Sequence, residues 1–156
     1  AVGLARDNIV LDTDIPNVII RPHPWRRLKT KGSERTLPLV GCSLWAAERA
    51  VEASQHSPYL FPRYCNDKGC KANSASAALN KWLKQTIGDS YVMHSFRHSM
   101  RDRLRAVNCP SEMIDQIGGW SKRTTGHRYG TGFGLDHLSS YLAKCKTDAL
   151  TQPQHQ

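Results

Sequence analysis

Residues 94–129 read HSFRHSMRDRLRAVNCPSEMIDQIGGWSKRTTGHRY. His94 and Arg97 are three residues apart, so on a helix they share one face. Trp120 follows a Gly-Gly pair, and Tyr129 lies nine residues beyond it. Arginine offers a planar fork of donors to phosphate oxygens, and tyrosine is one of the side chains that can form a covalent intermediate. The pattern therefore indicates chemistry on a phosphate.

Each of these residues alone has an ordinary structural interpretation. A single histidine such as His94 is more often half-buried and hydrogen-bonded, and a single arginine such as Arg97 is more often a surface cation. Trp120 alone is most often a core residue, and Tyr129 alone would be an ordinary interface tyrosine. Only the joint order and spacing of the four positions favour the functional interpretation.

The composition points to a polyanionic partner. The net charge is +9, with 22 Lys and Arg against 13 Asp and Glu, and the isoelectric point is near 9.6. This favours nucleic acid first and an anionic membrane second. The 156 residues fit one domain with a sizeable core, and 39% are hydrophobic. No apolar run is long enough to span a membrane and no signal peptide is visible, so we expect a cytoplasmic protein with no membrane partner.

The cysteines do not suggest a disulfide framework, because their number is odd and their positions are scattered. They are Cys42, Cys65, Cys70, Cys109 and Cys145. Cys65 and Cys70 flank NDKG, but no second Cys/His pair with ligand spacing is near, so we expect reduced thiols and no zinc site. No carboxylate cluster suits Mg²⁺ either, and the sequence predicts neither a metal nor a cofactor.

The first third of the chain predicts a small antiparallel sheet. Apolar runs suggest strands at Ile9–Leu11, Val18–Arg21 and Arg35–Leu39. A basic turn containing Lys29 and Lys31 joins the last two strands into a hairpin, whose ordinary interpretation is a solvated turn. The fold class predicted is α+β, mostly helical, with this sheet near the N-terminus.

The rest of the chain predicts helices. They are expected at residues 43–54, 73–87 and 94–107, in a short segment starting at Ser111, in a segment starting near Ser121 that would carry Tyr129, and at residues 135–146. Residues 56–70 read as mostly loop. Ser43 is expected to cap the first of these helices and Trp45 to lie in the core. Three further groups of apolar residues are expected to form helix faces: Leu79, Trp82, Leu83 and Ile87; Met113, Ile114 and Ile117; and Leu135, Leu138, Tyr141 and Leu142.

The third helix carries a cationic stripe. Arg97, Arg101 and Arg105 recur every four residues and so lie on one side of the helix. Helix, short turn and helix over residues 97–125 also fit a helix-turn-helix DNA reader, in which these arginines contact phosphate and nothing is catalytic. Such a reader does not require a tyrosine at the position of Tyr129.

The H-x-x-R of His94 and Arg97, the Gly-Gly-Trp ending at Trp120 (where many members have Leu-Gly-His) and the tyrosine nine residues on resemble the catalytic domain of the tyrosine recombinase, or phage integrase, family. The resemblance implies that Tyr129 attacks the scissile phosphate and forms a 3′-phosphotyrosine link. Arg97 would bind a non-bridging oxygen. His94 would hydrogen-bond the same phosphate or assist proton transfer. Trp120 would donate its indole N–H or pack against the nucleophile's helix.

The resemblance also implies a general acid on the basic hairpin. A lysine there would protonate the leaving 5′ oxygen. Lys29 is favoured, and Lys31 stays open as the alternative. Further DNA contacts would come from the basic residues near the site: Lys31, Arg101, Arg105, Lys122, Arg123 and Arg128.

The resemblance covers nearly the whole chain. It implies an integrase-type DNA breaking-rejoining fold over residues 1–147, with residues 148–156 as a polar, disordered tail. The family's first catalytic arginine would fall before Ala1, so the sequence given is expected to be a fragment that binds DNA weakly and cleaves poorly or not at all. The closing helix at residues 135–146 would dock either on its own domain or on a neighbouring protomer.

The function implied is site-specific recombination of double-stranded DNA, for integration or excision of a mobile element. The protein would be bacterial or phage-encoded, a monomer in isolation and a homo-tetramer on DNA. Two alternatives remain. One is a non-catalytic DNA-binding module or degenerate relative that uses the same basic helices. The other is an enzyme similar to type IB topoisomerases, which shares the active-site logic.

Overall fold

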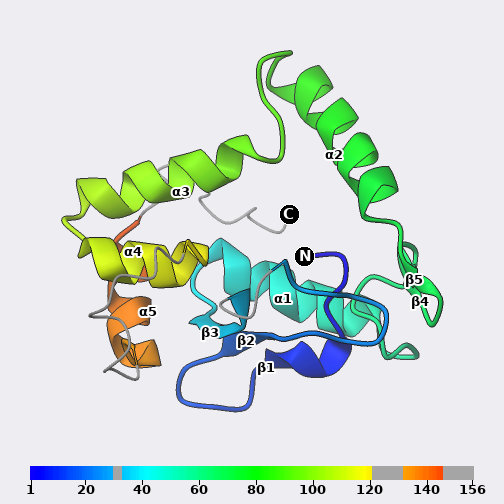
Figure 1. Ribbon diagram of the computed structural model, residues 1–156, viewed down its shortest axis with the longest axis horizontal. Helices are drawn as coiled ribbons and strands as arrows, with labels where there is room; N and C mark the ends of the chain where they lie inside the picture. Colours follow the sequence, from blue (N-terminus) through cyan, green and yellow to red (C-terminus); the bar gives the residue numbers. More distant parts are fainter. Residues whose placement is uncertain (30–32, 121–131, 146–156) are drawn as a thin grey trace, which may run out of the picture.

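The computed structural model describes residues 1–29, 33–120 and 132–145 (Figure 1). A 3-10 turn, η1 (Arg6–Asn8), leads into a three-stranded antiparallel sheet. The strands are β1 (Ile9–Val10), β2 (Asn17–Ile20) and β3 (Arg35–Pro38). A second, two-stranded ladder joins β4 (Cys65–Asn66) to β5 (Gly69–Cys70). The predicted small antiparallel sheet near the N-terminus is thereby confirmed.

Helices make up about half of the remaining described chain. They are α1 (Cys42–Ala53), α2 (Ala72–Thr86), α3 (Ser95–Ala106), α4 (Ser111–Gly118) and α5 (Leu135–Lys144). All five fall within a few residues of the predicted ranges, and the α+β class is confirmed. Among the described residues, no helix is both long and apolar enough to cross a membrane.

The register of the sheet explains how a proline is accommodated in it. β2 pairs with β3 from Asn17 opposite Pro38 to Ile20 opposite Arg35. The sheet order β1-β2-β3 leaves β3 at an edge. Proline lacks the N–H that a central strand would need, so the last position of an edge strand suits Pro38. The same register places Arg35 at the start of β3.

The main core lies where α3, α4 and α5 meet. Its buried members are Leu104, Cys109, Met113, Ile114, Ile117 and Leu138. The helical spacing predicted the apolar face of α4 and the inward position of Leu138, and both are confirmed. Helix α5 also contacts β3, so it packs on its own domain.

Several large apolar residues of α1 and α2 are exposed, and the prediction that Trp45 lies in the core is wrong. The side chain of Trp45 is 61% exposed, and α1 buries only Ala47. On α2, Leu83 is 1% exposed, whereas Trp82 is 55% exposed. Leu79 and Ile87 are exposed as well. Figure 1 shows the reason, because α2 extends away from the sheet and from α4 and α5.

The predicted cap of the first helix is also wrong. The N-cap of α1 is Gly41, with φ +52°, and Ser43 lies inside the helix. The Ser43 hydroxyl instead donates to the Val40 carbonyl at 2.8 Å and accepts from the Val40 N–H at 2.9 Å. The hydroxyl therefore closes the turn that precedes the helix.

Two cysteines expected to be reduced form a disulfide. Cys65 and Cys70 face each other across the β4–β5 ladder, which brings their sulfurs together. The expectation of reduced thiols is therefore wrong for this pair. Cys109 and Cys145 are free thiols, and burial raises the pKa of each. The charge of the nearby Cys145 thiolate raises the pKa of Cys109 further.

Candidate functional site

The corner after α4 fixes the position of Trp120. Gly119 has φ +63°, a left-handed conformation that favours glycine. Its N–H donates to the Gln116 carbonyl, and the Trp120 N–H donates to the Asp115 carbonyl at 2.9 Å. This pair of bonds is the Schellman pattern that ends helices. A Cβ on Gly118 would lie 1.9 Å from the Trp120 ring, so the ring folds back over the end of α4.

Two arginines of α3 lie on the ring of Trp120. The Cζ atom of Arg97 is 4.3 Å from the ring centroid, and that of Arg101 is 5.1 Å from it. The two arginines are one helical turn apart and so share a face of α3. Each cation–π contact contributes about 0.5–2 kcal/mol. The structure therefore brings together three of the residues singled out in the sequence.

A third arginine comes from the sheet. Arg35 Nε donates to the Ile117 carbonyl at 3.2 Å, and Nη1 donates to the Ser33 carbonyl at 2.8 Å. A Cβ on Gly119 would lie 2.6 Å from Nη1, so the guanidinium packs against the bare backbone of the corner. Burial lowers the pKa of Arg35, and the nearby charge of Arg97 lowers it further. Arg35 is not among the site residues predicted from the sequence.

In the part of the chain that the structure describes, no acidic partner balances the charge of these three residues. We call Arg35, Arg97 and Arg101 the arginine cluster. Within residues 1–29, 33–120 and 132–145, no carboxylate lies within 4.0 Å of a nitrogen of the cluster. Arg101 Nε is buried and has no hydrogen-bond partner in that part of the chain. Like charges held together repel each other, so the arrangement suits an anion.

Other arginines show the contrast. Arg105 pairs with Asp102 at 3.7 Å, and Arg49 pairs with Glu52 at 3.0 Å. Both pairs are exposed, so each contributes little to stability. Arg105 was predicted to contact DNA from the same stripe of α3 as Arg97 and Arg101. Among the described residues, however, its guanidinium lies on Asp102 and not on the Trp120 ring.

His94 and Lys29 both lie in the described part of the chain, but there neither side chain forms a hydrogen bond, ion pair or ring contact with the arginine cluster. His94 is exposed at the N-terminal end of α3, and its ring lies edge-on to that of His98 at 5.1 Å. Its carbonyl accepts the Arg97 N–H at 3.0 Å, so the two predicted site residues are adjacent through the backbone. Lys29 is exposed at the described end of the basic hairpin. The roles assigned to both side chains stay predictions.

Several predicted site residues lie outside the described part of the chain. They are Lys31, Lys122, Arg123, Arg128 and the proposed nucleophile Tyr129. The predicted helix after Trp120 and the polar tail at residues 148–156 also fall there. Their roles therefore stay predictions.

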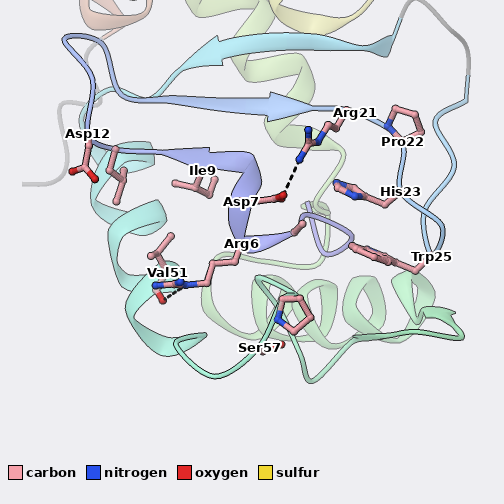
Figure 2. Close-up of a pocket in the computed structure, with 13 residues that line it drawn as sticks. Arg6, Asp7, Ile9, Asp12, Arg21, Pro22, His23, Trp25, Val51 and Ser57 are labelled. Atoms are coloured by element: carbon pink, nitrogen blue, oxygen red, sulfur yellow. Dashed lines mark hydrogen bonds and ion pairs between the residues drawn. The ribbon is translucent and has the colours of Figure 1, made fainter.

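A cavity of about 700 Å³ lies elsewhere, between η1, the start of the sheet and the end of α1 (Figure 2). Its charges are largely partnered, since Arg21 pairs with Asp7 at 2.8 Å and Arg6 Nε donates to the Val51 carbonyl. His23 stacks on Trp25 at 4.7 Å. Burial, followed by the charges of neighbouring arginines, lowers the pKa of His23 and favours its neutral form. No residue of the arginine cluster lines this cavity.

The fold and the site define an α+β chain in which Arg97 and Arg101 lie on the ring of Trp120 and Arg35 packs against the adjoining Gly119. None of the three has an acidic partner among the described residues. No known protein family, no curated protein and no solved structure matches the chain.

The corner geometry makes a prediction about Gly118. In Gly118→Ala the new methyl group would occupy the place of the Trp120 ring, so the ring must leave the two α3 arginines. We expect a loss of about 1–3 kcal/mol in the free energy of unfolding, which is typical of overpacking. The emission of Trp120, isolated as the difference from a Trp120→Phe partner, should change as well.

The matched control for this variant is Gly41→Ala. Gly41 has a positive φ, which Gly118 does not, but nothing lies within 4 Å of a Cβ placed there. Gly41→Ala should therefore lower stability through backbone strain and leave the Trp120 emission as in the unmodified chain. An unchanged Trp120 emission in Gly118→Ala would contradict the described corner.

Proposed function

We propose that the chain is a catalytic domain of a tyrosine-type site-specific DNA recombinase, with an integrase-type fold. It would cleave and rejoin DNA strands through a 3′-phosphotyrosine intermediate, for integration or excision of a mobile element. The observation that carries the proposal is the arginine cluster on Trp120. Arg97 of the H-x-x-R motif and the Gly-Gly-Trp corner are separated in sequence, and the fold brings them together with Arg35 and Arg101, which have no acidic partner among the described residues.

The cluster suits the charge that develops in phosphoryl transfer. Transfer without a metal needs a nucleophile, neutralisation of a phosphorane-like transition state and a proton for the leaving oxygen. Arg97 would bind a non-bridging oxygen, and Arg101 lies one turn away, with an Nε that has no hydrogen-bond partner in the described part of the chain. Because the guanidiniums are already held on Trp120, little reorganisation is needed when the negative charge grows.

The remaining steps are assigned to Tyr129, Lys29 and His94. The oxygen of Tyr129 would attack phosphorus while the bond to the 5′ oxygen breaks. Lys29 would deliver a proton to that oxygen, and His94 would hydrogen-bond the phosphate or accept the phenol proton. The phosphotyrosine bond retains the energy of the phosphodiester, so a new 5′ hydroxyl can displace Tyr129 without ATP.

The partner proposed is double-stranded DNA, because a chain with net charge +9 is attracted to a polyanion. Strand exchange joins four DNA ends, so we propose a homo-tetramer on DNA that forms from monomers. A bacterial or phage origin and a cytoplasmic location belong to the same proposal.

A non-catalytic DNA-binding module is the second candidate, because the arginine cluster could hold a phosphate without Tyr129. A helix-turn-helix version of it is disfavoured by α4, which would be the helix that reads bases. Its residues 111–118 include Glu112 and Asp115 and no Lys or Arg. Its large apolar residues are buried in the core. Little of α4 is left to face DNA.

The test is covalent capture. The protein is expressed with any residues that its gene encodes before Ala1. It is incubated with sheared DNA from its source and then denatured in SDS. Any DNA that stays attached is sequenced, and Tyr129→Phe is the control. DNA retained by the unmodified protein alone would support the recombinase and reveal its target site. DNA retained by neither protein would contradict catalysis and leave the binding module.

A further inference from the structure

We infer that Arg35 is a further phosphate ligand of this site, presented by the sheet and not by α3. The inference rests on the proposed function, since the ligand is a phosphate of the bound DNA. It adds a residue that the H-x-x-R and Gly-Gly-Trp spacing does not contain.

The hydrogen bonds of Arg35 to the described residues leave part of its donor fork unused. A guanidinium has five N–H donors. Nε and Nη1 donate to the carbonyls of Ile117 and Ser33, and Nη2 makes no hydrogen bond to the described residues. The two carbonyls come from α4 and from the end of the basic hairpin, so they hold the fork in a fixed orientation. Nη2 is left to donate to an oxygen of a ligand.

The surroundings of Arg35 favour a ligand that carries negative charge. The guanidinium stays charged at neutral pH, because arginine keeps its proton in proteins even when burial lowers its pKa. Arg97 is near enough for its charge to lower the pKa of Arg35. No carboxylate among the described residues pairs with either side chain. A phosphate between the two would remove their repulsion and add charge-assisted hydrogen bonds.

A purely structural role explains less of this arrangement. The bonds to Ile117 and Ser33 use two of the five donors, and neither needs a charge beside Arg97. A glycine at position 119 lets the guanidinium approach the corner that carries Trp120. Arg35 thus reaches the same corner as Arg97 and Arg101, although it belongs to β3 and they belong to α3.

The test measures DNA affinity as a function of salt concentration, with a short fluorescent duplex and the 156-residue chain. Each phosphate contact contributes about 0.9 to the slope of log Kobs against log salt. Arg35→Gln should reduce the slope by about that amount and weaken binding about tenfold. Arg35→Lys keeps the charge and should keep the slope. The control is Arg49→Gln, which removes an arginine that is exposed and paired with Glu52, so it should change neither quantity.

Weaker binding of Arg35→Gln with an unchanged slope would overturn the inference, because it would mean that Arg35 only positions the corner. If circular dichroism shows that Arg35→Gln is unfolded, a titration of the unmodified chain provides the test instead. Inorganic pyrophosphate is titrated while the guanidinium resonances of Arg35 and Arg97 are followed by NMR. Both should shift with one dissociation constant. A shift of Arg97 alone would also overturn the inference.

The outcomes separate this inference from the proposed function. If Arg97→Gln lowers the slope and covalent capture through Tyr129 succeeds, an unchanged slope in Arg35→Gln removes only the role of Arg35. If capture fails while Arg35→Gln lowers the slope, the phosphate contact stands and the proposed enzymatic activity fails.

Discussion

Replacing Arg97 with glutamine is expected to slow covalent attachment to DNA by about 10²–10³-fold, the usual effect of removing one charge-assisted contact to a transition state. Glutamine has a similar reach but no charge, so it cannot neutralise the phosphorane-like species. It also loses the cation–π contact with Trp120, whose ring centroid is 4.3 Å from Arg97 Cζ. The rate would be measured in a single turnover on the duplex recovered by covalent capture.

Arg105→Gln is the matched control for this variant. It removes the same charge from the same helix, but Arg105 pairs with Asp102 and is exposed. We expect its rate of attachment to fall by no more than about threefold, within the range of exposed ion pairs. Equal losses in both variants would mean that general charge on α3, and not the site at Trp120, supports the reaction.

Replacing Leu138 with alanine is expected to lower the free energy of unfolding by about 2–5 kcal/mol. Leu138 of α5 is fully buried and packs in the core with Leu104, Met113 and Ile117. Its truncation would remove apolar contacts and leave a cavity beneath the helix that carries Arg97. Urea unfolding followed by circular dichroism would measure the loss.

The control is Leu79→Ala on α2, whose side chain is 41% exposed. It should cost less than about 1 kcal/mol. Because α5 packs on its own domain, the loss in Leu138→Ala should not depend on protein concentration. A loss that grew on dilution would mean instead that α5 is buried against a second copy.

The elements with strong local patterns could be predicted from the sequence. The apolar spacing of Met113, Ile114 and Ile117 fixes the buried face of α4, and the Gly118–Gly119 pair predicts the turn that orients Trp120. These signals lie within a few residues of each other, so no tertiary information is needed to interpret them. The sheet and its hairpin were predicted from apolar runs for the same reason.

Other features depend on contacts that local patterns do not contain. Arg35 bonds to the carbonyl of Ile117, 82 residues away, so its place beside Arg97 could not be derived from spacing. Trp45 and Trp82 have the helical spacing of core residues, but no described element covers them fully. The Cys65–Cys70 disulfide depends on the register of a two-residue ladder, which five scattered cysteines do not reveal.

The most direct test of the recombinase proposal is to locate the covalent bond. The protein is trapped on a nicked duplex that contains the captured site, so that the cleaved end diffuses away. The complex is then digested with nuclease and trypsin and analysed by mass spectrometry. The account predicts a nucleotide attached through its 3′ phosphate to Tyr129. An adduct on another residue, such as Tyr91 or Tyr141, would contradict it, as would the absence of any adduct from protein that binds the same duplex.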